Sequence, residues 1–185
     1  FGYCASIATL NIKDIAAWCD IEFEDETSNP MYYAESICLN GTLVEDIVIP
    51  DGVTRIGNYA FYGYDSLASI TIPDGVTSIG DYALYNCESL TSIILPDSVT
   101  AIGDYAFAFC YDITSITMSD SVTSIGEYAF SQMRKITSIT IPDSVISIDV
   151  GAFAGCNEIT HVYITDISAW CGIDFGSESS NPLKI

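Results

Sequence analysis

Apolar residues recur along this chain at a fixed spacing of 23 positions, with similar polar and turn-forming residues between them. Five consecutive segments carry the pattern. They read IPDGVTRIGNYAF from Ile49, IPDGVTSIGDYAL from Ile72, LPDSVTAIGDYAF from Leu95, MSDSVTSIGEYAF from Met118 and IPDSVISIDVGAF from Ile141. One repeat of this length cannot close a core alone, but stacked repeats can, because each apolar column then becomes a continuous ridge.

Four apolar columns predict the interior of such a stack. They consist of Leu67, Leu90, Ile113, Ile136 and Ile159; of Ile70, Ile93, Ile116, Ile139 and Val162; of Val53, Val76, Val99, Val122 and Val145; and of Ile56, Ile79, Ile102, Ile125 and Ile148. The pattern therefore places equivalent side chains of successive repeats in neighbouring layers of one core.

Each repeat predicts a coil with three sides. The stretch typified by LTSI, followed by a β-branched and an apolar residue, predicts a strand. Pro-Asp-Gly or Pro-Asp-Ser predicts a turn, and VTSI a second short extended piece. A glycine follows, and then DYAF and its neighbours predict a helical turn with an Asp near its start. Strands of neighbouring coils should pair in parallel about 4.8 Å apart, with right-handed connections.

A longer phrase occurs near both ends of the chain and shows how the repeats are organised. DIAAWCDIEFEDETSNP begins at Asp14, and DISAWCGIDFGSESSNP begins at Asp166, 152 residues later. Residues 1–30 and 153–182 are identical at 15 of 30 positions. Ile12 and Ile49 lie 37 residues apart, 14 more than one repeat, so one long coil precedes the five ordinary coils.

We therefore expect a single solenoid fragment over residues 1–185, cut from a longer repeat protein. Residues 1–12 would be the tail of a preceding repeat, 13–48 the long coil with a hairpin, 49–165 the five repeats, and 166–185 the start of the next long coil.

The long coil carries its own signals. Asn40-Gly41 between apolar runs predicts a β-hairpin with strands at about 33–39 and 42–49. DIAAWC predicts a short helix that leads into an extended stretch. The aromatic residues of this phrase are expected to anchor the long coils on the solenoid; they are Trp18, Phe23, Trp170 and Phe175.

The repeat motif, typified by LASITIPDGVTSIGDYALYNCESLTSI from Leu67, resembles the BspA-like family of bacterial surface leucine-rich repeats. The resemblance covers residues 49–164, with residues 1–12 as a partial copy. The sequence departs from the repeat motif at three places. Ser119 stands in place of Pro, Asp149-Val150-Gly151 in place of Gly-Asp-Tyr, and Met133 in the Cys column.

The resemblance implies a right-handed leucine-rich-repeat solenoid of the α/β class, rich in β-strands. Its parallel strands would stack at the 23-residue period, with one long coil carrying a β-hairpin excursion. It also implies a secreted or cell-surface protein with a protein-binding or adhesive role. Partners of the family include host matrix and plasma proteins such as fibronectin and fibrinogen. The family supplies no general catalytic residues.

Composition and charge exclude several classes of partner. The chain has 25 acidic and 5 basic side chains, a net charge of −20, which repels nucleic-acid phosphates. No run approaches 18 apolar residues, so we expect no membrane insertion. The charge serves solubility in the simplest interpretation; attraction to basic protein patches or cations is the alternative.

Catalysis and metal binding find little support in the sequence. His161 is the only histidine, which leaves one candidate base for a Ser-His-Asp or Cys-His mechanism, and no phosphate-binding glycine loop occurs. We predict no enzyme activity, no cofactor and no metal site. Two acidic columns are assigned to turn formation and helix capping, although calcium binding stays open; they are Asp51, Asp74, Asp97, Asp120 and Asp143, and Asp81, Asp104 and Glu127.

The seven cysteines include no CxxC pair. Four of them share one column of the repeat, where a buried thiol packs as a small apolar group: Cys4, Cys87, Cys110 and Cys156. Parallel side-chain directions disfavour pairing between coils, so no obligatory disulfide is expected.

Outward positions of the strands are the predicted ligand contacts, because solenoids use such extended faces for recognition. These residues are Thr91, Ser92, Thr114, Ser115, Thr117, Thr137, Ser138, Thr140, Thr160, His161 and Tyr163. The sequence thus predicts a non-catalytic protein-binding or adhesion module, extracellular or on the cell surface. A purely structural spacer and a carbohydrate-binding face are the alternatives. Regular rows of small residues favour the spacer, and the cluster at Thr160, His161 and Tyr163 favours recognition.

Overall fold

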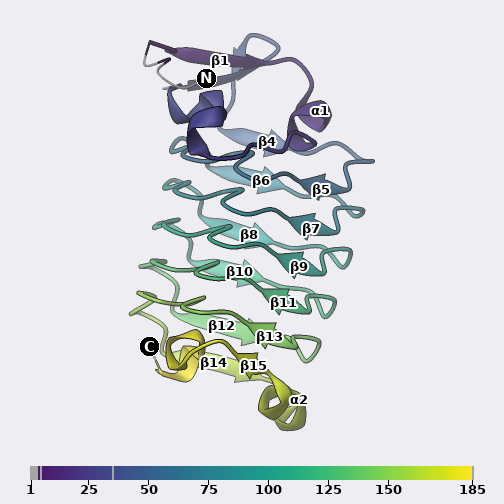
Figure 1. The fold of residues 1–185 in the computed structure, drawn as a ribbon, viewed down its shortest axis with the longest axis vertical. Helices are drawn as coiled ribbons and strands as arrows, with labels where there is room; N and C mark the ends of the chain where they lie inside the picture. The colour runs from purple at the N-terminus through teal and green to yellow at the C-terminus, as the bar shows by residue number, and fades with distance from the viewer. Residues whose placement is uncertain (1–3, 5, 35, 185) are drawn as a thin grey trace.

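The structure, a computed structural model, is a solenoid of coils stacked along one axis (Figure 1). It describes residues 4, 6–34 and 36–184. The expected partial repeat over residues 1–12 includes residues 1–3 and 5, which lie outside the described residues, as does residue 35 of the expected hairpin.

The first side of the solenoid is built from one strand per coil. These strands are β4 (Asp46–Val48), β6 (Ser69–Thr71), β8 (Ser92–Ile94), β10 (Ser115–Thr117), β12 (Ser138–Ile141) and β14 (His161–Ile164). The hydrogen-bonded pairs are β4 with β6, β8 with β10, and β12 with β14, all parallel. Each pair joins residues 23 positions apart, such as Asp46 with Ser69. The predicted strands and their stacking period are confirmed.

The second side is a continuous parallel sheet that follows the Pro-Asp turns. Its strands are β5 (Arg55–Ile56), β7 (Ser78–Ile79), β9 (Ala101–Ile102), β11 (Ser124–Ile125), β13 (Ser147–Ile148) and β15 (Asp174–Phe175), hydrogen-bonded in that order. The second extended piece predicted in each repeat is therefore confirmed.

The third side contains no helix in the described part of coils 49–164, so the helical turn predicted for DYAF is wrong. Tyr82 has a φ of 55°, in the left-handed region, and the equivalent tyrosines share this conformation. Amides alternate between two partners: Ala83 N donates to Gly80 O within the coil (3.3 Å), and Leu84 N donates to Ala106 O of the next coil (2.8 Å). Because every second amide bonds to the neighbouring coil, an α-helical ladder cannot form.

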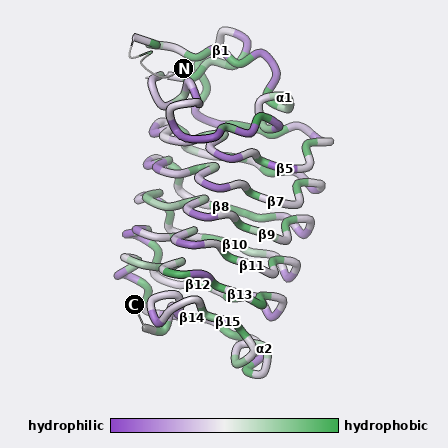
Figure 2. Tube along the Cα trace, in the orientation of Figure 1, coloured by the Kyte–Doolittle hydropathy of each residue, from purple (hydrophilic) through white to green (hydrophobic). Residues whose placement is uncertain are grey.

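Equivalent apolar side chains fill one continuous core, as predicted. Val76, Val99 and Val122 are each 0% exposed, and the other columns are buried along most of the stack. Phe107, Phe130 and Phe153 form a further column of stacked rings with centroids 5.6 Å apart. Figure 2 shows the same succession of hydrophobic and hydrophilic segments repeated from coil to coil.

β1 (Thr9–Ile12) precedes the long coil, which begins with the short helix α1 (Ile15–Cys19) and continues with 3-10 turns over Glu26–Ser28 and Pro30–Tyr32. The helix is N-capped by Asp14, whose carboxylate accepts hydrogen bonds from Ala16 N and Ala17 N. β2 (Ser36–Leu39) then pairs in parallel with β1.

The predicted hairpin is confirmed at its turn, but its second strand is shorter than expected. β2 pairs antiparallel with β3 (Thr42–Leu43) across Asn40 and Gly41, which have positive φ values of 52° and 82°. Residues 46–48 instead form β4 and pair with β6. These residues lie 23 positions before β6, so they belong to the stacked strands of the solenoid and pair with β6 rather than extending the hairpin. At the other end of the hairpin, Tyr33 follows a 3-10 turn rather than opening a strand.

The two copies of the long phrase adopt similar local structures in different surroundings. α2 (Ile167–Gly172) repeats α1 and is capped by Asp166 in the same way, and 3-10 turns over Glu178–Ser180 and Pro182–Lys184 follow. Trp18 is buried and its Nε1 donates to Ala60 O at 2.8 Å, whereas Trp170 is half-buried. The anchoring role predicted for Trp18 is confirmed.

None of the helices in the described residues has the length and apolar character needed to cross a bilayer.

Candidate ligand-binding face

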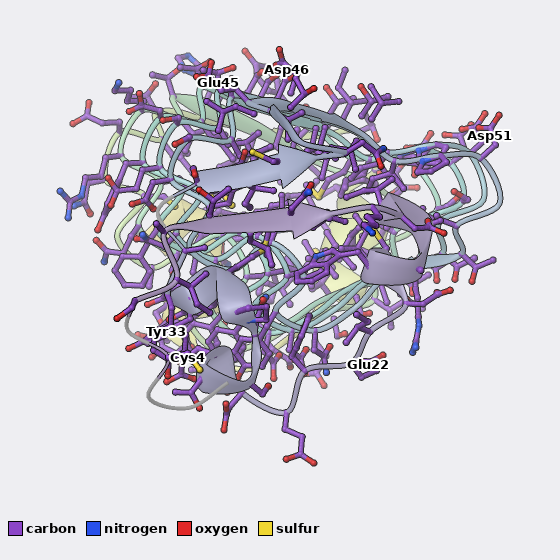
Figure 3. All side chains as sticks on the ribbon, turned by 90° about the horizontal axis from the view of Figure 1, so that it is seen from above. Cys4, Glu22, Tyr33, Glu45, Asp46 and Asp51 are labelled. Carbon is purple, nitrogen blue, oxygen red and sulfur yellow. The ribbon has the colours of Figure 1, made fainter. Side chains whose placement is uncertain are left out.

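The outward side chains of β4 to β14 form a flat surface, which we call the strand face. It has three columns over six coils, and Figure 3 shows its first members, Glu45 and Asp46, pointing away from the interior. The columns are Glu45, Ala68, Thr91, Thr114, Thr137 and Thr160; Asp46, Ser69, Ser92, Ser115, Ser138 and His161; and Val48, Thr71, Ile94, Thr117, Thr140 and Tyr163.

Every side chain that the sequence singled out as a ligand contact lies on the strand face. All are exposed except Ser138, which is partly buried. The structure thus brings these residues together on one surface, and their role in binding stays a prediction. It also adds a sixth coil to the face, because Glu45, Asp46 and Val48 occupy the same columns.

Threonine hydroxyls brace the first column of the strand face. Thr114 Oγ1 donates to Thr91 O (3.3 Å), and Thr160 Oγ1 donates to Thr137 O (3.2 Å), each across one coil. Their protons are thereby used within the solenoid, which leaves the oxygens of exposed threonines as acceptors. These hydroxyls can accept hydrogen bonds from a ligand at little entropic cost, since their rotamers are already fixed.

The C-terminal end of the strand face differs from the small-residue rows. Tyr163 is 54% exposed, and its ring lies nearly parallel to that of His161 with centroids 6.2 Å apart. His161 Nδ1 lies 2.9 Å from Thr160 Oγ1, which orients the imidazole. Exposed aromatic rings held in fixed positions are the side chains that most often dominate binding energy at interfaces.

A groove crosses the strand face where β6 and β8 meet, with a volume of about 490 Å³. Ile70 and Ile72 on its floor are 9% and 8% exposed, whereas Ile93 and Leu95 in the next coil are 1% and 2% exposed. Ile94 on its rim is 67% exposed. The groove exposes apolar side chains within the Ser/Thr rows, and no regular feature of the sequence indicates it.

Side-chain oxygens at the position that holds Asn58 and the first two members of the second acidic column, Asp81 and Asp104, bridge the coils. Asn58 Oδ1, Asp81 Oδ1 and Asp104 Oδ1 each accept the amide of the equivalent residue in the next coil, at 2.8, 2.8 and 2.7 Å. The helix-capping role predicted for them is wrong, because no helix follows. No group of three or more His, Cys, Asp or Glu in the described residues is arranged to hold a metal ion.

A ladder of tyrosines on the third side is a surface that the sequence analysis missed. The rings of Tyr59, Tyr82 and Tyr105 stack with centroids 4.8 Å apart, and Tyr128 continues the ladder at 5.0 Å. Partial burial, with neighbouring tyrosines, raises the pKa of Tyr82 to about 12. Tyrosine recurs every 23 residues in the sequence, and this recurrence was the signal that could have revealed the ladder. The predicted helical turn did not place these tyrosines on one surface.

The cysteines in the described residues are all free thiols. Three of the column cysteines donate to main-chain carbonyls of the preceding coil; Cys87 Sγ lies 3.3 Å from Phe61 O, and Cys110 and Cys156 make equivalent contacts. Burial, with a smaller contribution from Asp20, raises the pKa of Cys19 to about 12, and burial raises that of Cys156 to about 11. Cys171, the counterpart of Cys19, is exposed.

This difference predicts selective alkylation. A raised pKa lowers the thiolate fraction at any pH below it, and the thiolate is the reactive form, so at pH 8 Cys19 should react with iodoacetamide about 100-fold or more slowly than Cys171. Peptide mass spectrometry after timed labelling measures the ratio. In urea the two cysteines should react at similar rates; similar rates in the folded protein would contradict the burial of Cys19.

Comparison with known proteins shows that the chain is similar to bacterial leucine-rich repeat proteins. Residues 34–164 match the model of the BspA type leucine rich repeat region, in six copies. Among curated proteins, none matches the sequence.

Several solved structures share the fold at low sequence identity. The leucine-rich repeat protein of T. pallidum superposes with a TM-score of 0.59 at 23% identity, over 76% of this chain and 79% of that one. A leucine rich cell surface protein of Faecalibacterium prausnitzii gives 0.54 at 22% identity, over 94% and 64%. The pneumococcal vaccine antigen PcpA gives 0.57 at 20% identity, over 97% of this chain and 43% of that one. The chain therefore spans less than half the length of the last of these proteins.

Proposed function

Because this chain belongs to the BspA-type leucine-rich-repeat family, we propose that it is a non-catalytic recognition module of a secreted or cell-surface bacterial protein, which binds a protein ligand through the strand face. Host matrix or plasma proteins are the class of ligand that we propose. The fold supports a module of stacked repeats whose surface residues vary on a fixed frame.

The observation that carries the proposal is the change in character along the strand face. From β8 to β12, Ser and Thr occupy the outward columns except at Ile94, and at the end of the face His161 and Tyr163 replace them. Both aromatic rings are exposed, although burying them would stabilise the fold. A spacer with no ligand requires no such replacement.

The test is direct binding of the purified chain to immobilised fibronectin and fibrinogen by surface plasmon resonance. Binding to at least one of them is expected, and replacing Tyr163 by alanine together with His161 by alanine should weaken it by about tenfold or more. Ile146→Ala is the matched control, because Ile146 is 65% exposed but lies on the second side of the solenoid.

The possible results separate the candidate functions. Binding that Ile146→Ala weakens as much as the double substitution would assign recognition to another surface. If neither protein binds, and a panel of further matrix proteins and glycans also fails, the chain acts as a spacer. Binding to glycans alone would favour the carbohydrate-binding alternative.

A further inference from the structure

A second surface with the composition of a binding site lies on the other side of the solenoid. There a pocket of about 410 Å³ opens between the 3-10 turn over Pro30–Tyr32 and the third side of the next two coils. We call it the aromatic pocket; its aromatic and polar lining residues are Tyr32, Tyr33, Tyr62, Tyr85, Asp65 and Asn86. Figure 3 shows Tyr33 across the solenoid from Glu45 and Asp46 of the strand face.

The tyrosine rings of the pocket present different parts of their surfaces. Tyr62 and Tyr85 stack on each other with centroids 4.9 Å apart and an interplanar angle of 3°, so each covers one face of the other. Tyr32 meets Tyr33 edge-on at 4.9 Å and is tilted by 38° against Tyr62 at 6.1 Å. Tyr32 is 48% exposed, which leaves much of its ring accessible from the pocket mouth.

Negative charge accompanies these rings. Asp65 lines the pocket and accepts a hydrogen bond from Asn86 Nδ2 at 3.1 Å. Partial burial, with repulsion from Glu88, raises the pKa of Asp65. Within the described residues, no lysine or arginine forms an ion pair with Asp65. Burial raises the pKa of Tyr62, and Tyr85 and Glu26 add smaller contributions.

The described residues that line the pocket include no lysine or arginine. Elsewhere in the described chain, Arg55 pairs with Asp20 and Glu22, and Lys135 pairs with Asp112 at 2.7 Å. The negative charge of the pocket is therefore not balanced by any residue in its lining.

We propose that the aromatic pocket binds a cationic side chain, the ammonium of lysine or the guanidinium of arginine, presented by a basic segment of a protein partner. Tyrosine faces attract cations through the ring quadrupole, and Asp65 supplies a full counter-charge beside them. The chain makes the same contact internally, where the guanidinium carbon of Arg134 lies 4.3 Å above the ring of Tyr111. The net charge of −20 favours the approach of a basic segment.

Charge distinguishes this ligand from a sugar. A neutral saccharide would pair with no charge in the pocket, whereas a cation gains both the attraction of the ring quadrupole and the counter-charge of Asp65. The proposal does not depend on the strand face, because the pocket and that face occupy different sides of the solenoid.

The experiment is an NMR titration of the folded chain with singly charged probes, N-acetyl-arginine methylamide and N-acetyl-lysine methylamide. A single charge keeps general attraction to the acidic protein small. Saturable shifts of the Asn86 side-chain and Gly63 amide resonances are expected below about 50 mM probe, a range suited to weak ligands. The neutral N-acetyl-norleucine methylamide and N-acetylglucosamine should leave these resonances in place.

Two variants test the contributions separately. Tyr32→Leu keeps an apolar side chain but removes the ring, and Asp65→Asn keeps the shape but removes the charge; each should weaken binding by about fivefold or more. The matched controls, Tyr128→Leu and Asp97→Asn, remove a ring at the far end of the tyrosine ladder and an exposed carboxylate elsewhere, and should change nothing.

Three results would overturn the proposal. They are shifts of equal size with the neutral probe or the sugar, equal losses in Asp97→Asn and Asp65→Asn, or no saturable shift with either cation. None of them bears on the strand face, whose test uses different ligands and different variants.

Discussion

Replacing Phe130 by alanine is expected to destabilise the solenoid by about 3–5 kcal/mol, the range for removing a buried phenylalanine ring. Phe130 is 0% exposed, and its ring lies between those of Phe107 and Phe153, each 5.6 Å away. Truncation leaves a cavity between two rings that cannot close together. The coil spacing is fixed by main-chain bonds such as Phe130 N to Ala152 O, at 2.9 Å.

The loss should be local as well as large. Coils of a solenoid contact only their neighbours, so a defect in this layer weakens the coupling between the repeats on either side. Urea denaturation followed by circular dichroism measures the change in the free energy of unfolding. Amide hydrogen exchange should accelerate most in the coils around Phe130 and least in the long coil.

Phe130→Leu is the matched control, because Leu84 already occupies this column two coils earlier and is 0% exposed. The leucine variant should lose only about 1 kcal/mol, because leucine leaves a much smaller cavity than alanine does. If Phe130→Ala and Phe130→Leu had equal free energies of unfolding, the side chain at position 130 would not be what fills this layer of the core.

Replacing Gly103 by alanine is expected to cost about 2–3 kcal/mol, because the new methyl group would collide with the preceding coil. A Cβ at this position would lie 2.7 Å from Gly80 C and 2.7 Å from Asp81 N, both main-chain atoms, and 2.5 Å from Asp81 Oδ1. Its φ is not in the left-handed region, so the requirement for glycine is close approach rather than backbone freedom.

The collision would also strain the bridge between coils. Asp81 Oδ1 accepts Asp104 N at 2.8 Å directly beside Gly103, and separating the coils lengthens this bond. The last repeat has Asp149 in the glycine column, and the bridging bonds of this column extend in the described residues only as far as Glu127 N.

Thermal and urea unfolding of the variant measure the effect of Gly103→Ala. Gly172→Ala provides the control, since a Cβ there meets nothing within 4 Å and Gly172 ends a helix, where alanine is tolerated. Equal stability of the two variants would show that neighbouring coils can separate freely at Gly103.

The tyrosine ladder and the aromatic pocket could not be predicted from the sequence. Recurrence of Tyr59, Tyr82 and Tyr105 at the repeat period was visible, but their stacking depends on a left-handed conformation at each tyrosine. The pocket further depends on the 3-10 turn at Pro30–Tyr32 lying beside coils that follow it by some 30 to 55 residues in sequence. Neither juxtaposition has a local sequence signal.

The sequence by itself determined the solenoid, its 23-residue layer, the apolar columns and the outward rows of the strand face. A period repeated five times specifies which side chains share a layer, because only stacking can bury them. Only the tertiary structure decided the backbone conformation of the third side and the point at which the hairpin ends and β4 begins. It also decided which sides of the solenoid carry the groove and the aromatic pocket. Those features depend on hydrogen bonds and contacts between coils, and the amides of DYAF alternate between two coils instead of completing a helix. Local propensity depends on the residues of one coil, whereas the conformation of the third side depends on hydrogen bonds to the neighbouring coil.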